Sequence, residues 1–245
     1  MRTARGFSLI EIAVAAFIIA LLLGSILVPL TTQVEQRQNN ETQKTLEEIK
    51  EALIGYALVN GNLPCPDKTT GATTGPNDTP NDGVEDFNTG TGSCTTIASG
   101  VSIGNVPWRT LGVAATDVWG NRFHYVVTAL FAQRSPAATL TLTTAGGVQV
   151  CQTAACATVL TTTSQTAAAI LSYGRNGYGA MNGLTGASNT APTSADELEN
   201  TDGDNILVSR TVTALGAAAG EFDDIVTWLS RNILLNRMVA AGKLP

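Results

Sequence analysis

The chain has 245 residues, of which only 14% are charged, and its formal net charge at pH 7 is −6. This length is enough for one sizeable hydrophobic core besides an anchor helix. An acidic chain with so few cations offers no basic surface for phosphate groups, so the composition argues against nucleic acid as a partner.

The N-terminus combines a basic segment with a long apolar one. Arg2 and Arg5 precede an apolar run over residues 7–30 that only Glu11 interrupts with a charge. A run of this length can cross a bilayer as a helix. The positive-inside rule then predicts a cytoplasmic N-terminus and an extracytoplasmic body. A cleavable secretory signal is the rival interpretation, but no small-x-small cleavage site ends the run.

Glu11 needs a partner in this apolar run. An ionised carboxylate at mid-bilayer costs about 2.5 to 3.5 kcal/mol on insertion scales, and the run contains no Lys or Arg. Cleavage between Gly6 and Phe7 would create a positive α-amino group four residues away, available to Glu11 of the same or a neighbouring copy. The cut itself would therefore supply the missing cation.

The segment Gly6-Phe7-Ser8-Leu9-Ile10-Glu11 resembles the cleavage and methylation motif of type IV pilins and type II secretion pseudopilins. The resemblance implies that a prepilin peptidase cuts after Gly6 and methylates Phe7, and that Glu11 sets subunit register in a helical filament. It also implies three further partners: the inner membrane, an assembly platform in it, and other copies or related pilins and pseudopilins. An ordinary single-pass anchor with a chance glutamate is the alternative.

The helix is expected to continue beyond the apolar run. Leu46, Ile49 and Leu53 recur at three- and four-residue spacing in a segment free of proline, which predicts an amphipathic helix. We expect four parts in the chain: a cleaved leader at 1–6, a transmembrane and assembly helix at 7–30, its amphipathic continuation at 31–58, and an extracytoplasmic head at 59–245.

The head is expected to contain antiparallel sheet. Residues 67–104 are rich in turn-forming residues and predict a long loop, whereas Ser230 to Gly242 predicts a short C-terminal helix. Predicted strands lie at 123–127, 139–143, 148–151, 157–161, 168–173, 205–208 and 224–229. The expected class is α+β and pilin-like, with a long N-terminal helix, membrane-spanning in its first half, packed on an antiparallel sheet.

Four cysteines, Cys65, Cys94, Cys151 and Cys156, suit an oxidising extracytoplasmic compartment. Three pairings are possible, and the sequence alone does not select one. We favour Cys65 with Cys94 and Cys151 with Cys156, since each bond closes a local loop. A zinc site would need CxxC-type spacing, which these cysteines lack.

No pattern in the sequence supports an enzyme. The one histidine, His124, would have to serve any Ser/His/Asp triad, yet no G-x-S-x-G nucleophile elbow is present. Phosphate-binding glycine motifs are missing as well. We therefore expect a protein without catalytic residues.

Late carboxylates form a candidate calcium site. Asp202 and Asp204 flank Gly203 in the way that loops wrap a hard cation, although a solvated acidic loop has the same composition. Three segments also resemble the major pseudopilins of type II secretion in their order: Asp117-x-Trp119-Gly120-Asn121, Ser172-Tyr173-Gly174-Arg175-Asn176-Gly177 and Asp223-Asp224-Ile225-Val226-x-Trp228. This resemblance implies Ca²⁺ between the last two, held by Asp223 or Asp224. Asn176 stands where the family usually has Asp, and residues 178–222 replace a short loop.

These features predict a structural subunit of a pilus-like filament, a pseudopilin of a type II secretion-like system. The first alternative is a type IV pilin or minor pilin in adhesion, motility or DNA uptake, and the second is a membrane-anchored extracytoplasmic enzyme or binding domain. The subunit is expected in the inner membrane, with its head outside the cytoplasm, before assembly, and in a periplasmic or surface filament afterwards.

Overall fold

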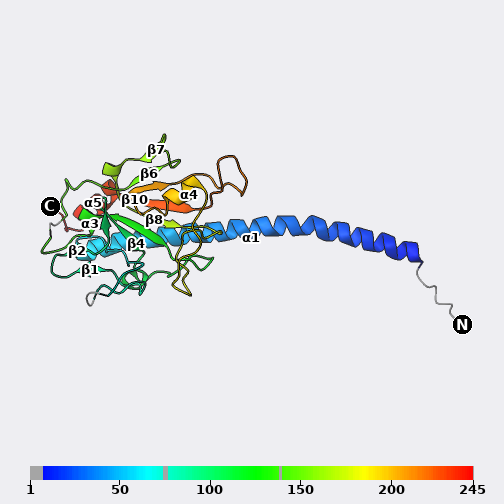
Figure 1. Cartoon of the computed structure of the whole chain (residues 1–245), viewed down its shortest axis with the longest axis horizontal. Helices are drawn as coiled ribbons and strands as arrows, with labels where there is room; N and C mark the ends of the chain where they lie inside the picture. Colours follow the sequence, from blue (N-terminus) through cyan, green and yellow to red (C-terminus); the bar gives the residue numbers. More distant parts are fainter. Residues whose placement is uncertain (1–7, 74–76, 138–139, 245) are drawn as a thin grey trace. The chain divides into compact units, whose positions relative to one another are not determined.

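The structure is a computed structural model that describes residues 8–73, 77–137 and 140–244, without the side chains of residues 23–32. It divides into two units, Met1–Glu41 and Thr42–Pro245. The first unit contains the N-terminal part of a 52-residue helix, α1 (Leu9–Asn60). The second contains the last turns of α1 and all other elements (Figure 1).

The predicted long N-terminal helix is confirmed as α1. Within the described part of the chain, no helical stretch is both long and apolar enough to span a bilayer. Part of the predicted span, the side chains of residues 23–32, lies outside the described residues.

The head is built on a five-stranded antiparallel sheet in the order β10-β8-β5-β4-β3. Its strands are β3 (Ile97–Ala98), β4 (Val101–Asn105), β5 (His124–Thr128), β8 (Thr166–Ser172) and β10 (Ile225–Ser230). Every residue of β8 is buried. Because side chains alternate between the faces of a strand, β8 contributes to a separate core on each face.

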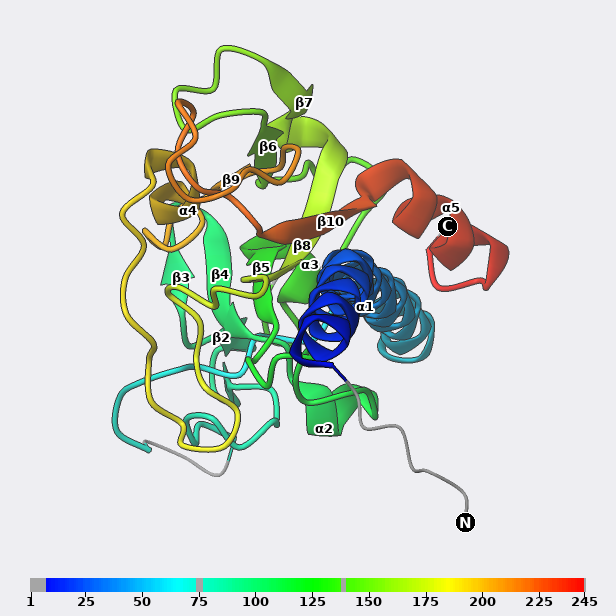
Figure 2. The ribbon, with the colours of Figure 1, turned by 90° about the vertical axis from the view of Figure 1, so that its right-hand side faces the viewer.

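One face of this sheet packs against the part of α1 that belongs to the second unit. Leu46, Ile49 and Leu53 are each 1% exposed or less, so the amphipathic face predicted from their spacing is the buried one. Burying a side chain of this size stabilises the fold by about 1.5 to 3 kcal/mol. The C-terminal helix α5 (Arg231–Ala240), also predicted, joins the same core (Figure 2).

The other face is covered by a smaller sheet in the order β7-β6-β9 and by a short helix, α4 (Ala195–Glu199). The strands of this sheet are β6 (Gln149–Cys151), β7 (Val159–Thr161) and β9 (Ile206–Val208). β6 pairs with β9 in parallel, whereas the sequence predicted antiparallel sheet alone. A parallel pair requires a long crossover, and the chain between these strands provides one that contains β7, β8 and α4.

The uninterrupted loop predicted at 67–104 is wrong. It contains the hairpin of β1 (Phe87–Asn88) and β2 (Ser93–Cys94), then β3, and most of β4. The strand β4 was not predicted because it contains Gly104, and glycine is unfavourable in strands. Here it permits a close approach, since a Cβ atom on Gly104 would lie 2.4 Å from the carbonyl oxygen of Asp67.

Three further short helices complete the fold: α2 (Trp108–Leu111), α3 (Ala129–Ala132) and the 3-10 helix η1 (Thr163–Gln165). The strand predicted at 139–143 is not formed, since residues 140–143 are in turn or irregular structure. Residue 139 lies outside the description.

The structure contains the disulfide pairs that the sequence analysis favoured. Cys65 bonds to Cys94 with a Cα–Cα distance of 5.4 Å, and Cys151 bonds to Cys156 with one of 5.1 Å. The first bond ties the irregular segment after α1 to the hairpin of β1 and β2.

A buried carboxylate, Glu85, joins four segments of the head. Arg134 donates hydrogen bonds to both of its oxygens, at 3.0 and 2.6 Å. The hydroxyl of Tyr56, on α1, donates at 2.7 Å, and the backbone N–H of Cys65 donates at 3.0 Å. The Arg134 guanidinium also stacks on the ring of Phe87, 3.9 Å from its centroid. Arg134 is the only charged one of these three hydrogen-bond donors, so the network depends on the Arg134 charge.

We expect Arg134→Ala to lower the free energy of unfolding by about 3 to 5 kcal/mol, because it leaves the Glu85 carboxylate buried without its cation. The matched control is Arg237→Ala, which breaks an exposed ion pair with Glu51 and should cost less than about 1 kcal/mol. Urea unfolding of both variants with the disulfides intact measures the difference. Equal losses would show that Glu85 needs no counter-ion.

Candidate functional site

The first turn of α1 gives Glu11 a partner within its own chain. The backbone N–H of Ser8 donates a hydrogen bond of 2.8 Å to the Glu11 carboxylate. In return, the backbone N–H of Glu11 donates to the hydroxyl of Ser8 at 3.4 Å. This reciprocal arrangement is a capping box, which satisfies backbone donors that a helix N-terminus otherwise leaves free. The predicted cleavage residues, Gly6 and Phe7, lie outside the described residues.

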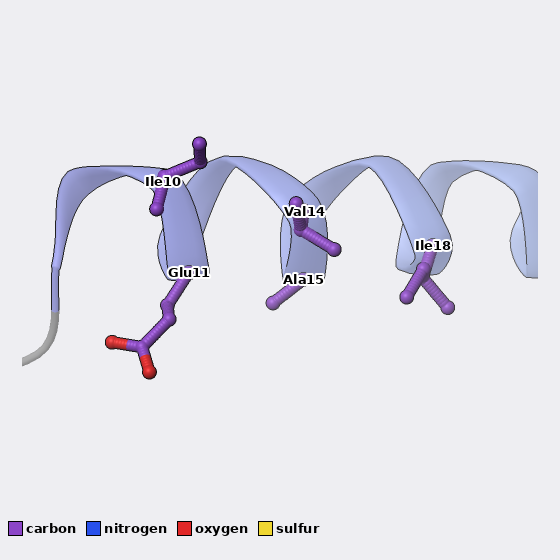
Figure 3. Close-up of a pocket in the computed structure, with 5 residues that line it drawn as sticks. All are labelled: Ile10, Glu11, Val14, Ala15 and Ile18. Atoms are coloured by element: carbon purple, nitrogen blue, oxygen red, sulfur yellow. The ribbon is translucent and has the colours of Figure 1, made fainter.

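The capping role of Glu11 was not predicted from the sequence, although the spacing S-x-x-E signals it. Apolar side chains lie near the Glu11 carboxylate on the first turns of α1 (Figure 3). Ile10, Val14 and Ile18 are 71%, 53% and 51% exposed. Glu11 therefore combines a helix cap with a carboxylate that lies beside exposed apolar surface.

The three head segments that resemble pseudopilins lie together in the structure. The hydroxyl of Ser172 donates a hydrogen bond of 2.6 Å to Asp117, and the backbone N–H of Asn176 donates one of 2.9 Å to Asp223. Gly174 lies between them with a φ of +60°, and a Cβ atom there would be 2.3 Å from the carbonyl oxygen of Asp223. These contacts fix the start of β10 against the end of β8.

The four carboxylates predicted to bind calcium are divided between two clusters. Asp223 and Asp224 lie with Glu197, and these three residues form the inner cluster. Asp202 and Asp204 lie with Glu199 in a more exposed outer cluster. In each cluster, one carboxylate oxygen from each residue lies within 4.8 Å of those from the other two.

Glu197 and Glu199 were not predicted from the sequence to belong to these clusters. Both belong to α4, which lies inside the 178–222 segment that was interpreted as an added loop. Their charge was the only signal in the sequence. Nothing in a single sequence shows that a helix in this segment returns to the start of β10.

The inner cluster is buried and only partly satisfied. Glu197 and Asp224 are 2% and 4% exposed. Asn176 donates a hydrogen bond of 2.9 Å to Glu197, and Asn200 donates one of 2.7 Å to Asp224. Two buried oxygens, Oε2 of Glu197 and Oδ1 of Asp223, accept no hydrogen bond from any described residue. Unsatisfied buried acceptors are rare and call for a ligand or a proton.

The three carboxyl groups of the inner cluster also have raised pKa values. Burial raises the pKa of Glu197, of Asp223 and of Asp224, and the negative charge of neighbouring carboxylates raises each pKa further. Such a group stays ionised at neutral pH only at a cost in stability. Carboxylate oxygens are also the ligands that Ca²⁺ prefers, so the inner cluster has the donor set for a calcium site.

We expect Glu197→Gln to raise the free energy of unfolding by about 1 kcal/mol at pH 7 without calcium, because it removes one of the repelling charges and keeps the shape. A raised folded-state pKa means that stability falls as pH rises from the unfolded carboxyl pKa, about 4, through the folded value. The gain should therefore shrink toward pH 4. Denaturant unfolding at both pH values measures it.

The control for this prediction is Glu48→Gln, which removes an exposed carboxylate paired with Lys44 and should change stability little at either pH. A Glu197→Gln protein that is less stable than the wild type at pH 7 would mean that the hydrogen bonds to the carboxylate outweigh the repulsion.

Comparison with known families identifies the N-terminal segment. A family model described as the prokaryotic N-terminal methylation motif matches residues 1–27, the segment that contains Gly6, Phe7 and Glu11. Comparisons with curated proteins and with solved structures found no match. The resemblance of the N-terminus is thereby confirmed: the chain carries the prepilin-type cleavage and methylation motif of type IV pilin-like proteins.

Proposed function

We propose that this protein is a structural subunit of a pilus-like filament, processed after Gly6 and assembled through its N-terminal helix as a pseudopilin of a type II secretion-like system. The observation that carries the proposal is the methylation motif at residues 1–27. The exposed apolar side chains that follow Glu11 support it, because a single chain leaves them uncovered.

A type IV pilin or minor pilin is the second candidate. It is favoured by the enlarged head, in which residues 178–222 contribute α4 and β9 instead of a short loop. Extra surface elements on a filament subunit suit a specialised binding role. A retraction ATPase encoded beside the protein would favour this candidate, and a secretin with other pseudopilins would favour the first.

The proposed assembly step is electrostatic. A carboxylate can accept about four hydrogen bonds, so Glu11 can keep the bond from Ser8 and still pair with the positive Phe7 amine of a neighbouring copy. An unpaired charge in an apolar helix bundle is costly. The requirement for this ion pair therefore fixes the register of each added subunit.

The proposed partners and location follow from the same motif. A prepilin peptidase would process the chain, and an inner-membrane platform would assemble it with other copies or related subunits. The precursor would be anchored in the inner membrane with its head outside the cytoplasm, and the filament would be periplasmic or on the cell surface. The two disulfides support an oxidising compartment for the head.

Two variants of Glu11 separate its charge from its capping role. Glu11→Gln keeps an oxygen acceptor for the Ser8 N–H, whereas Glu11→Ala removes both the acceptor and the charge. We expect both variants to be inserted into the membrane and cleaved, and both to lose filament assembly, because neither can neutralise an amine. Electron microscopy counts the filaments, and intact mass measures the cleavage.

The matched control is Ser8→Ala, which removes the hydroxyl of the capping box and leaves the Glu11 charge. It should assemble, with a helix N-terminus weakened by about 1 kcal/mol. Normal filaments from Glu11→Gln would mean that capping alone explains the glutamate. A mature chain that still carries residues 1–6 would overturn the proposed processing.

We also propose that the inner cluster binds Ca²⁺ and braces the head. Its two unsatisfied oxygens and its raised pKa values support this role. Calcium should raise the thermal midpoint of the wild type and should not raise that of Glu197→Gln, because binding stabilises only the folded state that contains the full donor set. Differential scanning calorimetry with and without a chelator measures both.

The matched control for the calcium prediction is Asp202→Asn in the outer cluster, which should keep the calcium response. An unchanged wild-type midpoint in calcium, or a response that disappears in Asp202→Asn but not in Glu197→Gln, would contradict the assignment to the inner cluster.

A further inference from the structure

A pocket of about 220 Å³ opens where β4 and β5 meet, and none of its lining residues belongs to the inner cluster or to α1. His124, the first residue of β5, pairs in register with Asn105, the last residue of β4. Side chains alternate along β5, so His124 lies on the opposite face from Tyr125, which packs in the core that contains α1. Tyr173, just after β8, lines the pocket beside it, with the two ring centroids 5.7 Å apart.

The polar lining of this pocket is neutral. No Asp, Glu, Lys or Arg lines it, and its polar side chains come from Thr69, Asn105, His124, Tyr173, Ser188 and Thr201. Burial lowers the pKa of His124 to about 4, so the imidazole is uncharged at neutral pH. A neutral imidazole offers one N–H donor and one nitrogen acceptor. A charged ligand would find no counter-ion among the lining residues.

Several of these polar groups have unused hydrogen-bonding capacity. The imidazole of His124 and the hydroxyls of Thr69 and Ser188 make no hydrogen bond with the described residues. Elsewhere in the head, polar side chains such as Asp117 and Asn200 are engaged in networks. Ser188 is exposed, and Thr69 and His124 are half-buried, so these groups are open to solvent at the pocket. A ligand with its own hydroxyl groups can take the place of water on them.

The pocket also has apolar walls, provided by Ile103, Met181 and the ring of Tyr173. Its volume lies below the 300 to 1,000 Å³ that is typical of sites for drug-sized ligands. A small ligand with C–H faces for these walls and hydroxyl groups for the imidazole and the side-chain hydroxyls matches size, charge and polarity together. We propose that this pocket binds a single neutral sugar residue.

The chain contains one histidine, which makes His124 an unambiguous spectroscopic reporter. The experiment uses the full chain labelled with ¹³C at histidine Cε1, in phosphocholine-headed micelles, since a sugar-headed detergent would itself compete. The probes are the methyl glycosides of glucose, galactose, mannose and N-acetylglucosamine, with glycerol as an acyclic control. We expect one glycoside to shift the His124 resonance saturably, with a Kd in the millimolar range.

Two tryptophan variants test whether the shift reports on the pocket. Ser188→Trp places a bulky ring at the exposed rim and should weaken binding at least about tenfold, or 1.4 kcal/mol. Thr190→Trp, two residues away and outside the lining, should leave the Kd unchanged. His124→Phe keeps the ring and removes both nitrogens, and calorimetric titration should show the same loss.

Three results would overturn the proposal: no glycoside that shifts His124 saturably, an equal response to glycerol, or an unchanged Kd in both Ser188→Trp and His124→Phe. The calcium and filament proposals do not depend on any of these results, because none of the pocket residues belongs to the inner cluster or to α1.

Discussion

The head depends on one strand that must be covered on both faces. β8 has the sequence TAAAILS and is buried throughout, so neither face can be left to water. Its alanines are small enough for flanking elements to pack closely. α1 and α5 cover one face, and the smaller sheet covers the other. The segment between β8 and β10 is thus part of the core structure, since it supplies α4 and β9.

The sequence predicted the parts of the fold that local pattern controls. The spacing of Leu46, Ile49 and Leu53 identified the buried face of α1, and loop closure favoured the disulfide pairs that the structure contains. The strand β4 was not predicted, because its Gly104 is required by a close tertiary contact with Asp67 and not by the strand itself. Contacts between distant segments leave no periodic signal in a single chain.

The candidate sites divide in the same way. The methylation motif is a local pattern, and the sequence located it fully. The inner cluster is not, because α4 brings Glu197 to the aspartates across more than 20 residues of chain. In the inner cluster, burial makes an uncompensated charge costly, and the proposed helix bundle of the filament would do the same for Glu11. The partner proposed for one is an amine made by cleavage, and for the other a divalent cation.

The Cys65–Cys94 bond has a mechanical consequence for a subunit held by its helix. Cys65 lies five residues after Asn60, the end of α1. A pulling force along α1 would therefore pass both to the backbone after Cys65 and, through the disulfide, to the hairpin that contains Cys94. Two segments of the chain would carry the force before any strand left the sheet. Reduction of the Cys65–Cys94 bond should therefore lower the force at which the head unfolds.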